Sequence, residues 1–200
     1  MKAGDVLVNP VTGMRLTIIA TAAETSGRSV TVEYELRPHS GRDYTPPHGH
    51  RTYVERFDIL SGRAATVVGG VMGTAAAGQS VHVPLNTVHI HPWNIGDEPL
   101  IVRQTTEALT PDPRGLSNAL ASAETLFELA HRGKVNANGQ PNPLQAAVIF
   151  NDLLLPDSYA AGLPYAAQRV LFGLLAAAGK LLGYRSTVPV NGQAQAATAP

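Results

Sequence analysis

Residues 46–62 read PPHGHRTYVERFDILSG, and this stretch decides how the rest of the chain is interpreted. His48 and His50 stand two residues apart, so on an extended strand both side chains point to the same face. Glu55 comes five residues later, and a turn or bulge must bring its carboxylate back to that face. His89 adds a third imidazole from a separate segment. Three imidazoles and a carboxylate suit one divalent transition metal, such as Fe, Mn, Ni or Zn, with a position left open for chemistry.

The composition indicates a globular protein with few charges. Of the 200 residues, 44% are hydrophobic and 15% are charged, against roughly 25% charged residues in an average soluble domain. Lys and Arg (15) balance Asp and Glu (15) without a basic block, so we expect no nucleic-acid partner. The absence of cysteine excludes disulfides, zinc–thiolate sites and cysteine nucleophiles. The first residues lack the apolar stretch of a secretion signal, which favours a cytoplasmic location.

Short strands separated by turn signals are predicted over residues 1–108. Residues 29–37 alternate most clearly, with Val30, Val32, Tyr34 and Leu36 on one face and polar side chains on the other. Short strands in this number favour a β-sandwich or a barrel. The other predicted strands are residues 14–20, 51–60, 64–68, 80–83, 88–93 and 100–106.

The apolar spacing changes to a helical period after the predicted strands. We expect helices over 116–132, 143–155 and 164–184, which together form a helical extension over residues 109–187. The extension is expected to pack on the barrel or in a dimer contact. Residues 188–200 lack periodicity and are predicted to form a mobile tail.

The stretch from His48 to Gly62 resembles the first motif of the cupin superfamily, which reads His-x-His, three or four residues, Glu, six residues and Gly. The leading glycine of the motif is displaced by one residue, at Gly41. The resemblance implies a mainly β fold, the double-stranded β-helix or jelly-roll barrel of two antiparallel sheets, with four metal ligands projecting inward. A barrel followed by a helical extension is similar to single-domain bacterial cupins of the cupin 2 type.

The second cupin motif is matched between Gly78 and Asn94. Pro84 follows Gly78 at the expected distance, and counting onward from Pro84 makes His89 the fourth ligand. Asn94 comes one residue late, which keeps His91 open as an alternative ligand. If His91 is not a ligand, it is a hydrogen-bond partner of a ligand, a proton shuttle or a structural histidine.

Five residues are candidates for a substrate pocket. Phe57 and Ile59 share a strand face with Glu55 and are expected to line the cavity. Tyr34 could hydrogen-bond a substrate and act in catalysis, or be plain core. The single tryptophan, Trp93, could cap an apolar pocket. Arg103 could anchor a carboxylate, or lie on the outer face of the sheet.

These features predict a metal-dependent enzyme of the dioxygenase-like cupin kind that acts on a small, largely apolar organic molecule. The alternatives are a non-redox isomerase, cyclase or lyase, a ligand-binding protein without turnover, and a metal that only stabilises the barrel. We expect a homodimer, because many cupins dimerise and few charges oppose association. The last helix could instead contact a membrane surface, although its apolar run is too short to span one.

Overall fold

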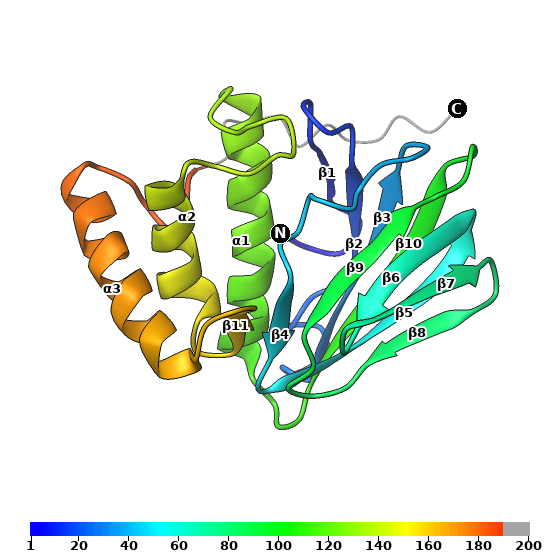
Figure 1. Cartoon of the computed structure of the whole chain (residues 1–200), viewed down its shortest axis with the longest axis horizontal. Helices are drawn as coiled ribbons and strands as arrows, with labels where there is room; N and C mark the ends of the chain where they lie inside the picture. Colours follow the sequence, from blue (N-terminus) through cyan, green and yellow to red (C-terminus); the bar gives the residue numbers. More distant parts are fainter. Residues whose placement is uncertain (190–200) are drawn as a thin grey trace.

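The computed structural model describes residues 1–189 and consists of two facing antiparallel sheets with helices at one side (Figure 1). The six-stranded sheet has the order β1 (Val6–Val8), β2 (Arg15–Ala20), β3 (Ser29–Leu36), β10 (Leu100–Ala108), β5 (Tyr53–Ser61) and β8 (Ser80–Val83). The five-stranded sheet has the order β11 (Ser158–Ala160), β4 (His48–His50), β9 (His89–Asn94), β6 (Arg63–Val68) and β7 (Val71–Ala76). The predicted mainly β fold of two antiparallel sheets followed by helices is confirmed.

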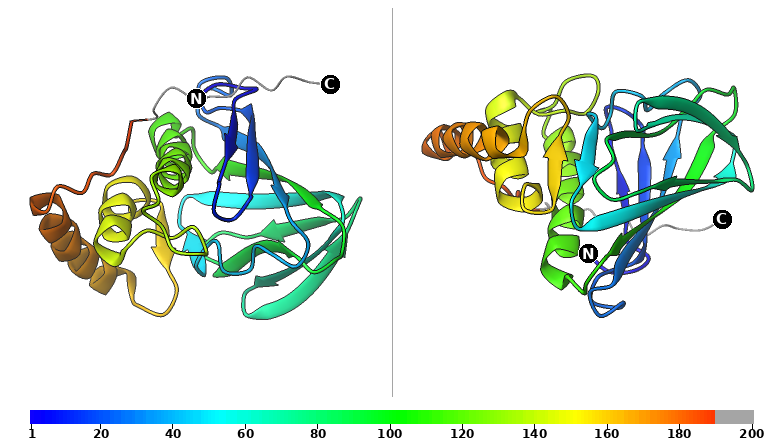
Figure 2. Two further views of the ribbon diagram at one scale, coloured as in Figure 1. Left: turned by 90° about the horizontal axis from the view of Figure 1, so that it is seen from above. Right: turned by 60° about the horizontal axis from the view of Figure 1, so that its bottom comes forward.

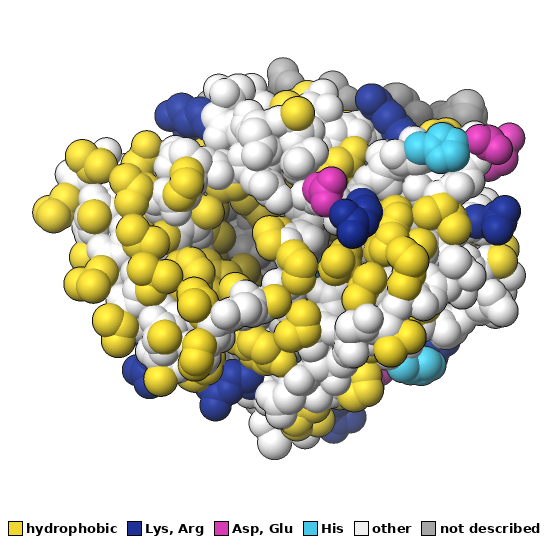
Figure 3. All heavy atoms as spheres, in the orientation of Figure 1, with side chains coloured by type: hydrophobic (Ala, Val, Ile, Leu, Met, Phe, Trp, Pro, Cys, Tyr) yellow, Lys and Arg dark blue, Asp and Glu magenta, His cyan; other side chains and the backbone are white. Residues whose placement is uncertain are grey.

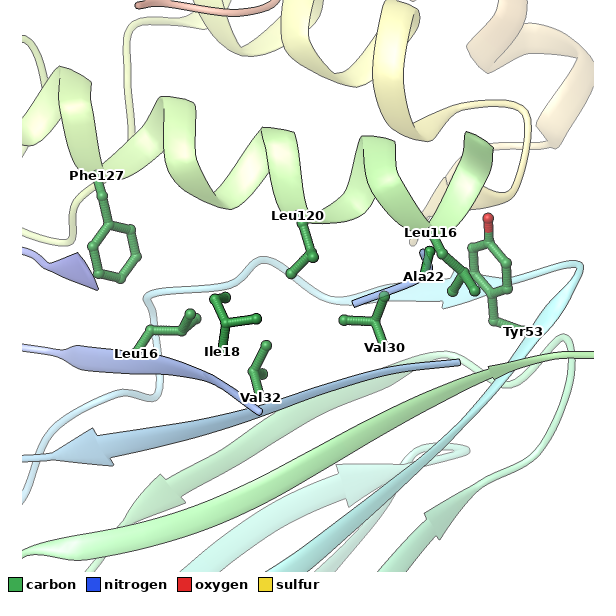
Figure 4. Close-up of a cluster of buried hydrophobic side chains, with 9 residues drawn as sticks. All are labelled: Leu16, Ile18, Ala22, Val30, Val32, Tyr53, Leu116, Leu120 and Phe127. Atoms are coloured by element: carbon green, nitrogen blue, oxygen red, sulfur yellow. The ribbon is translucent and has the colours of Figure 1, made fainter. Parts of the chain in front are cut away.

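The alternation predicted for residues 29–37 is confirmed in β3. The buried face of this strand contributes side chains to two separate hydrophobic clusters. Tyr34 and Leu36 lie between the two sheets with side chains of β5, β6 and β10. Val30 and Val32 instead pack under helix α1 (Pro113–His131), against Leu116 and other apolar residues (Figure 4). Helix α1 therefore covers the part of the six-stranded sheet that the second sheet leaves open. Each Val or Leu buried there contributes roughly 1.5–3 kcal/mol.

Two of the helices, α1 and α2, begin at side-chain caps. The Asp112 side chain accepts a hydrogen bond from the Gly115 amide, 2.9 Å away, and Pro113 occupies the first turn. Helix α1 therefore starts three residues earlier than predicted. Asn142 caps α2 (Pro143–Ile149), which continues as a π-helical segment, Phe150–Leu154. Helix α3 spans Tyr165–Leu181 and lies at the outer edge of the molecule (Figures 1 and 2).

Strand β11 was not predicted from the sequence. It lies between the π-helical segment and α3, and it pairs antiparallel with β4, with Ser158 opposite His50 and Tyr159 opposite Gly49. The helical extension thus adds an edge strand to the sheet that carries three of the four predicted metal ligands. Gln168 of α3 holds the strand: its side chain accepts from the Ala160 amide and donates to the Ala160 carbonyl, both at 2.8 Å.

Three further predictions concern membrane contact by the last helix, the tail and the domain boundary. No helix among residues 1–189 is long and apolar enough to cross a membrane. The mobile tail was predicted for residues 188–200, of which 190–200 lie outside the described residues. The division of the chain at residue 108, between the end of β10 and the start of α1, stays a prediction.

Candidate metal centre

The two sheets bring five potential ligands together. His48 and His50 lie on β4, His89 and His91 lie on β9, and Glu55 lies on β5 of the opposite sheet. His48 pairs directly with His89 across β4 and β9. The chain turns at residues 51–52, between β4 and β5, which supplies the reversal that the spacing of Glu55 requires.

One oxygen of Glu55 is the centre of the cluster. Its Oε2 atom lies 2.8 Å from Nε2 of His89, 3.2 Å from Nε2 of His50 and 3.9 Å from Nε2 of His91. One potential ligand atom from each of His48, Glu55, His89 and His91 lies within 4.8 Å of the others. Ligands about 2.0–2.2 Å from one ion are at most about 4.4 Å apart, so modest side-chain movement would let one ion meet this set.

Four atoms of the cluster are buried without a hydrogen-bond partner. They are Oε2 of Glu55 and the Nε2 atoms of His50, His89 and His91. Their close approaches to one another lack the alignment of hydrogen bonds. Because an unpaired buried polar group costs about 1–3 kcal/mol, several such atoms facing one point indicate a missing partner. An ion with nitrogen and oxygen ligands fits that description.

Hydrogen bonds on the far side of two imidazoles leave the inner nitrogen free to bind a metal. Nδ1 of His48 lies 2.9 Å from the carbonyl oxygen of Pro46, and Nδ1 of His89 lies 3.3 Å from that of Thr87. A carbonyl only accepts, so in both rings Nδ1 carries the proton and Nε2 keeps its lone pair. Carbonyls and hydroxyls in this position commonly orient metal-binding histidines.

The other oxygen of Glu55 is held by strand β10. The side-chain amide of Gln104 donates to Oε1 at 2.7 Å, and the hydroxyl of Thr106 donates to it at 3.2 Å. This arrangement fixes the carboxylate and leaves Oε2 to face the imidazoles. Neither residue was predicted, although both share the inward face of β10 with the buried Val102.

Comparison with known families agrees with this geometry. Residues 35–104, which include all five potential ligands, match a family profile described as "Cupin domain". Residues 35–104 form a cupin domain. The predicted relationship to the cupin superfamily is therefore confirmed, and the matched segment ends before the helical extension begins.

Solved structures similar to this cupin domain cover about half of the chain. The cupin domain of Cnp3 from Schizosaccharomyces pombe has 15% sequence identity and a TM-score of 0.42, over 48% of this chain and 64% of that one. A predicted oxalate decarboxylase from Thermotoga maritima has 17% identity and a TM-score of 0.45, over 54% and 94%. A cupin 2 conserved barrel domain protein from Salinispora arenicola has 20% identity and a TM-score of 0.41, over 52% and 82%. No curated protein matches the chain.

The electrostatics of the cupin cluster keep the Glu55 carboxylate charged and disfavour protonation of His48 and His91. Burial raises the pKa of Glu55, but His50 and His89 outweigh burial and hold that pKa well below its usual range. Burial lowers the pKa of His91 to about 4, although Glu55 partly opposes the shift. Burial and the neighbouring imidazoles also lower the pKa of His48. Near neutral pH, these three groups therefore have the protonation states that metal binding requires.

Phe57, Ile59 and Tyr34 lie on the inner side of the six-stranded sheet. Phe57 and Ile59 are fully buried, and the Phe57 ring centre is 5.0 Å from that of His91. The Tyr34 hydroxyl donates to the Pro92 carbonyl at 3.3 Å, and burial raises its pKa, so it stays protonated. The surroundings of the cluster are thus apolar, as expected, while contact of these side chains with a substrate stays a prediction.

Trp93, a candidate for capping an apolar pocket, does not share the face of the histidines. In the pairing of β6 with β9, Val67 lies opposite Ile90 and Ala65 lies opposite Trp93, so β9 contains one extra residue. This bulge turns Trp93 to the same face as Ile90, away from the metal cluster. There its ring packs beneath Arg42, whose guanidinium lies 5.6 Å from the ring centre.

Arg103 takes the second of the two positions considered for it, on the outer face of the sheet and not in the pocket. It alternates along β10 with the inward-facing Val102 and Gln104, so its side chain points to the outer face. There it donates to the carboxylate of Glu33 and remains 44% exposed. A cavity of about 290 Å³ lies elsewhere in the molecule. It is lined by the end of α1, the start of α2 and residues 183–189.

Proposed function

We propose that this cupin domain binds one divalent transition metal through His48, Glu55, His89 and His91, with His50 as the alternative to His91. The observation that carries the proposal is the set of buried, unpaired nitrogen and oxygen atoms around Oε2 of Glu55. His50 stays in the proposal because its Nε2 is closer to that oxygen than the Nε2 of His91 is.

The proposed activity is that of a dioxygenase-like oxidoreductase acting on a small, largely apolar organic molecule. A bound transition metal would supply Lewis-acid or redox chemistry. The protein contributes a carboxylate fixed by Gln104 and Thr106, and apolar walls from Phe57 and Ile59 that exclude water. We further propose a homodimer, whose contact surface is derived in the next subsection.

Metal content tests the first part of the proposal. The protein is loaded anaerobically with Fe(II), Mn(II), Ni(II) or Zn(II), desalted and measured by mass spectrometry. We expect one ion per chain in the wild type and in His82→Gln, which changes an exposed histidine on β8. Glu55→Gln and His89→Gln should lose it. Failure of all four metals to bind stoichiometrically would overturn the proposed site.

Oxygen uptake tests the second part. The Fe(II)-loaded protein is incubated with small aromatic and branched aliphatic probes in an oxygen electrode, and the products are analysed. Consumption that depends on both the probe and Glu55 supports the oxidoreductase. Product formation without oxygen would instead establish the non-redox alternative, and saturable probe binding without any product would establish a binding protein.

A further inference from the structure

Helix α3 presents an exposed apolar face to the outside of the molecule (Figure 3). The opposite face packs inward: Gln168, Ala176 and Gly179 are buried, and Gly179 lies close to α2. Leu174, in the middle of the helix, is 68% exposed, and Leu181 is 89% exposed. The exposed stripe consists of Ala166, Ala167, Val170, Leu171, Leu174, Ala177, Ala178, Leu181 and Leu182.

The stripe has the periodicity of a helix–helix contact. Ala167, Val170, Leu174, Ala177 and Leu181 follow one another at alternating intervals of three and four residues. Apolar residues at this spacing form the seam along which two helices pack. In this helix the seam has no partner among the described residues, since the buried contacts of α3 are on its other side.

The sizes of the side chains in the stripe are complementary about Leu174. Two antiparallel copies of α3 that cross at Leu174 place Ala166 and Ala167 level with Leu182 and Leu181 of the other copy. They likewise place Val170 and Leu171 level with Ala178 and Ala177. Large side chains then meet small ones on both sides of Leu174, which meets its own copy, whereas a parallel pair would put every leucine level with a leucine. Alternation of large and small residues is what close packing of facing helices requires.

The buried second face of α3 favours a protein partner over a lipid surface. An amphipathic helix that lies on a membrane carries its basic residues on a solvated polar face. The face of α3 opposite the stripe is instead buried in the protein, and Lys180 is paired with Asp152 at 2.7 Å. Arg169 is the other charged residue of the helix. The part of the sequence after Val190 contains no large apolar residue that could cover the stripe.

We infer that the α3 stripe is the contact surface of the proposed homodimer, in which two copies of the helix pack antiparallel with the two-fold axis at Leu174. This inference rests on the proposed homodimer and is independent of the metal chemistry. A self-complementary patch is what a two-fold interface requires, because each copy supplies the same surface. The helical extension would then join two chains. On its other side it contributes β11 to the sheet that carries the histidines of the proposed metal site.

Sedimentation equilibrium of the full chain tests the surface. We expect a wild-type dimer at micromolar concentration, and a dissociation constant raised at least tenfold by Val170→Glu. The matched control is Val71→Glu on β7, where a valine is 72% exposed compared with 65% for Val170. A dimer that survives Val170→Glu would overturn the α3 surface but leave the homodimer standing. A wild-type monomer would overturn both, and its flotation with vesicles of anionic lipid would assign the stripe to a membrane surface.

A cross-linking experiment remains informative if the charged variant fails to fold. The natural chain has no cysteine, so a single Leu174→Cys substitution introduces the only thiol. Residues on a two-fold axis lie next to their own copies, and mild oxidation should convert Leu174→Cys to a covalent dimer in high yield. Val71→Cys should remain largely monomeric under the same conditions. Equal cross-linking of the two variants would overturn the predicted axis.

Discussion

The Nδ1 atom of His50 lies 2.9 Å from the hydroxyl oxygen of Ser158, a residue 108 positions later in the chain. Both side chains are buried, and their strands pair directly at this point. Ser158 belongs to β11, the strand that the helical extension contributes to the five-stranded sheet. The extension therefore helps to orient a histidine of the proposed metal site, although it lies outside the matched cupin segment.

Removal of the Ser158 hydroxyl is expected to weaken metal binding. Ser158→Ala leaves the His50 ring without its outer partner, so its effect on metal affinity should not exceed that of His50→Gln; loss of a metal ligand's partner typically reduces the affinity about 10–100-fold. Ser158→Thr retains a hydroxyl and should recover much of the affinity. Competition with a chromophoric chelator measures the change. Ser117→Ala, which removes an exposed hydroxyl of α1, is the control. Unchanged affinity in Ser158→Ala would show that His50 needs no orienting partner.

Gly49 is expected to be intolerant of a larger residue. A Cβ atom there would lie 2.5 Å from the Tyr159 ring, so Gly49→Ala must displace that ring from β4. Such overpacking typically costs about 1–3 kcal/mol, and urea denaturation should show that loss. Gly73→Ala on β7 has open space around the new methyl group and should leave stability nearly unchanged. Equal stability of the two variants would contradict a tightly packed β4–β11 contact.

Acid is expected to destabilise the metal-free protein at unusually mild pH. The pKa of His91 falls from 6.5 to about 4 in the folded chain. Between these values the unfolded chain binds the proton and the folded chain does not, so stability decreases as the pH falls from 6.5 towards 4. The lowered pKa values of His48 and Glu55 act in the same direction. Urea midpoints measured across this range should fall, and less steeply for His91→Gln. A flat profile in the wild type would show that the imidazoles are solvated.

The two candidates for the fourth ligand, His91 and His50, can be separated by substitution. His91 belongs to the set whose ligand atoms lie within 4.8 Å of one another, so His91→Gln should lower metal affinity at least tenfold. His50→Gln should have the smaller effect if its ring only supports the site. Isothermal titration with Zn(II) or Mn(II) compares the two variants with His82→Gln. The reverse order of effects would assign the fourth position to His50 and return His91 to a supporting role.

The sequence by itself determined the features that depend on local periodicity. Alternation along β3 predicted its buried face, helical spacing predicted three helices after the strands, and the spacing of His48, His50, Glu55 and His89 predicted that their side chains would meet. These patterns are readable because a strand repeats every two residues and a helix about every 3.6. The element boundaries were less accurate, since caps such as Asp112 begin a helix before its apolar pattern starts.

Only the tertiary structure decided which side chains surround the cluster. The bulge in β9 arises from its pairing with β6. It turns Trp93 away from the face that it would share with His89 and His91 in a regular strand. Gln104 and Ser158 reach Glu55 and His50 from strands that are distant in sequence. Strand pairing between distant segments leaves no periodic signal in either segment, which is why β11 and its contact with His50 could be found only in the folded chain.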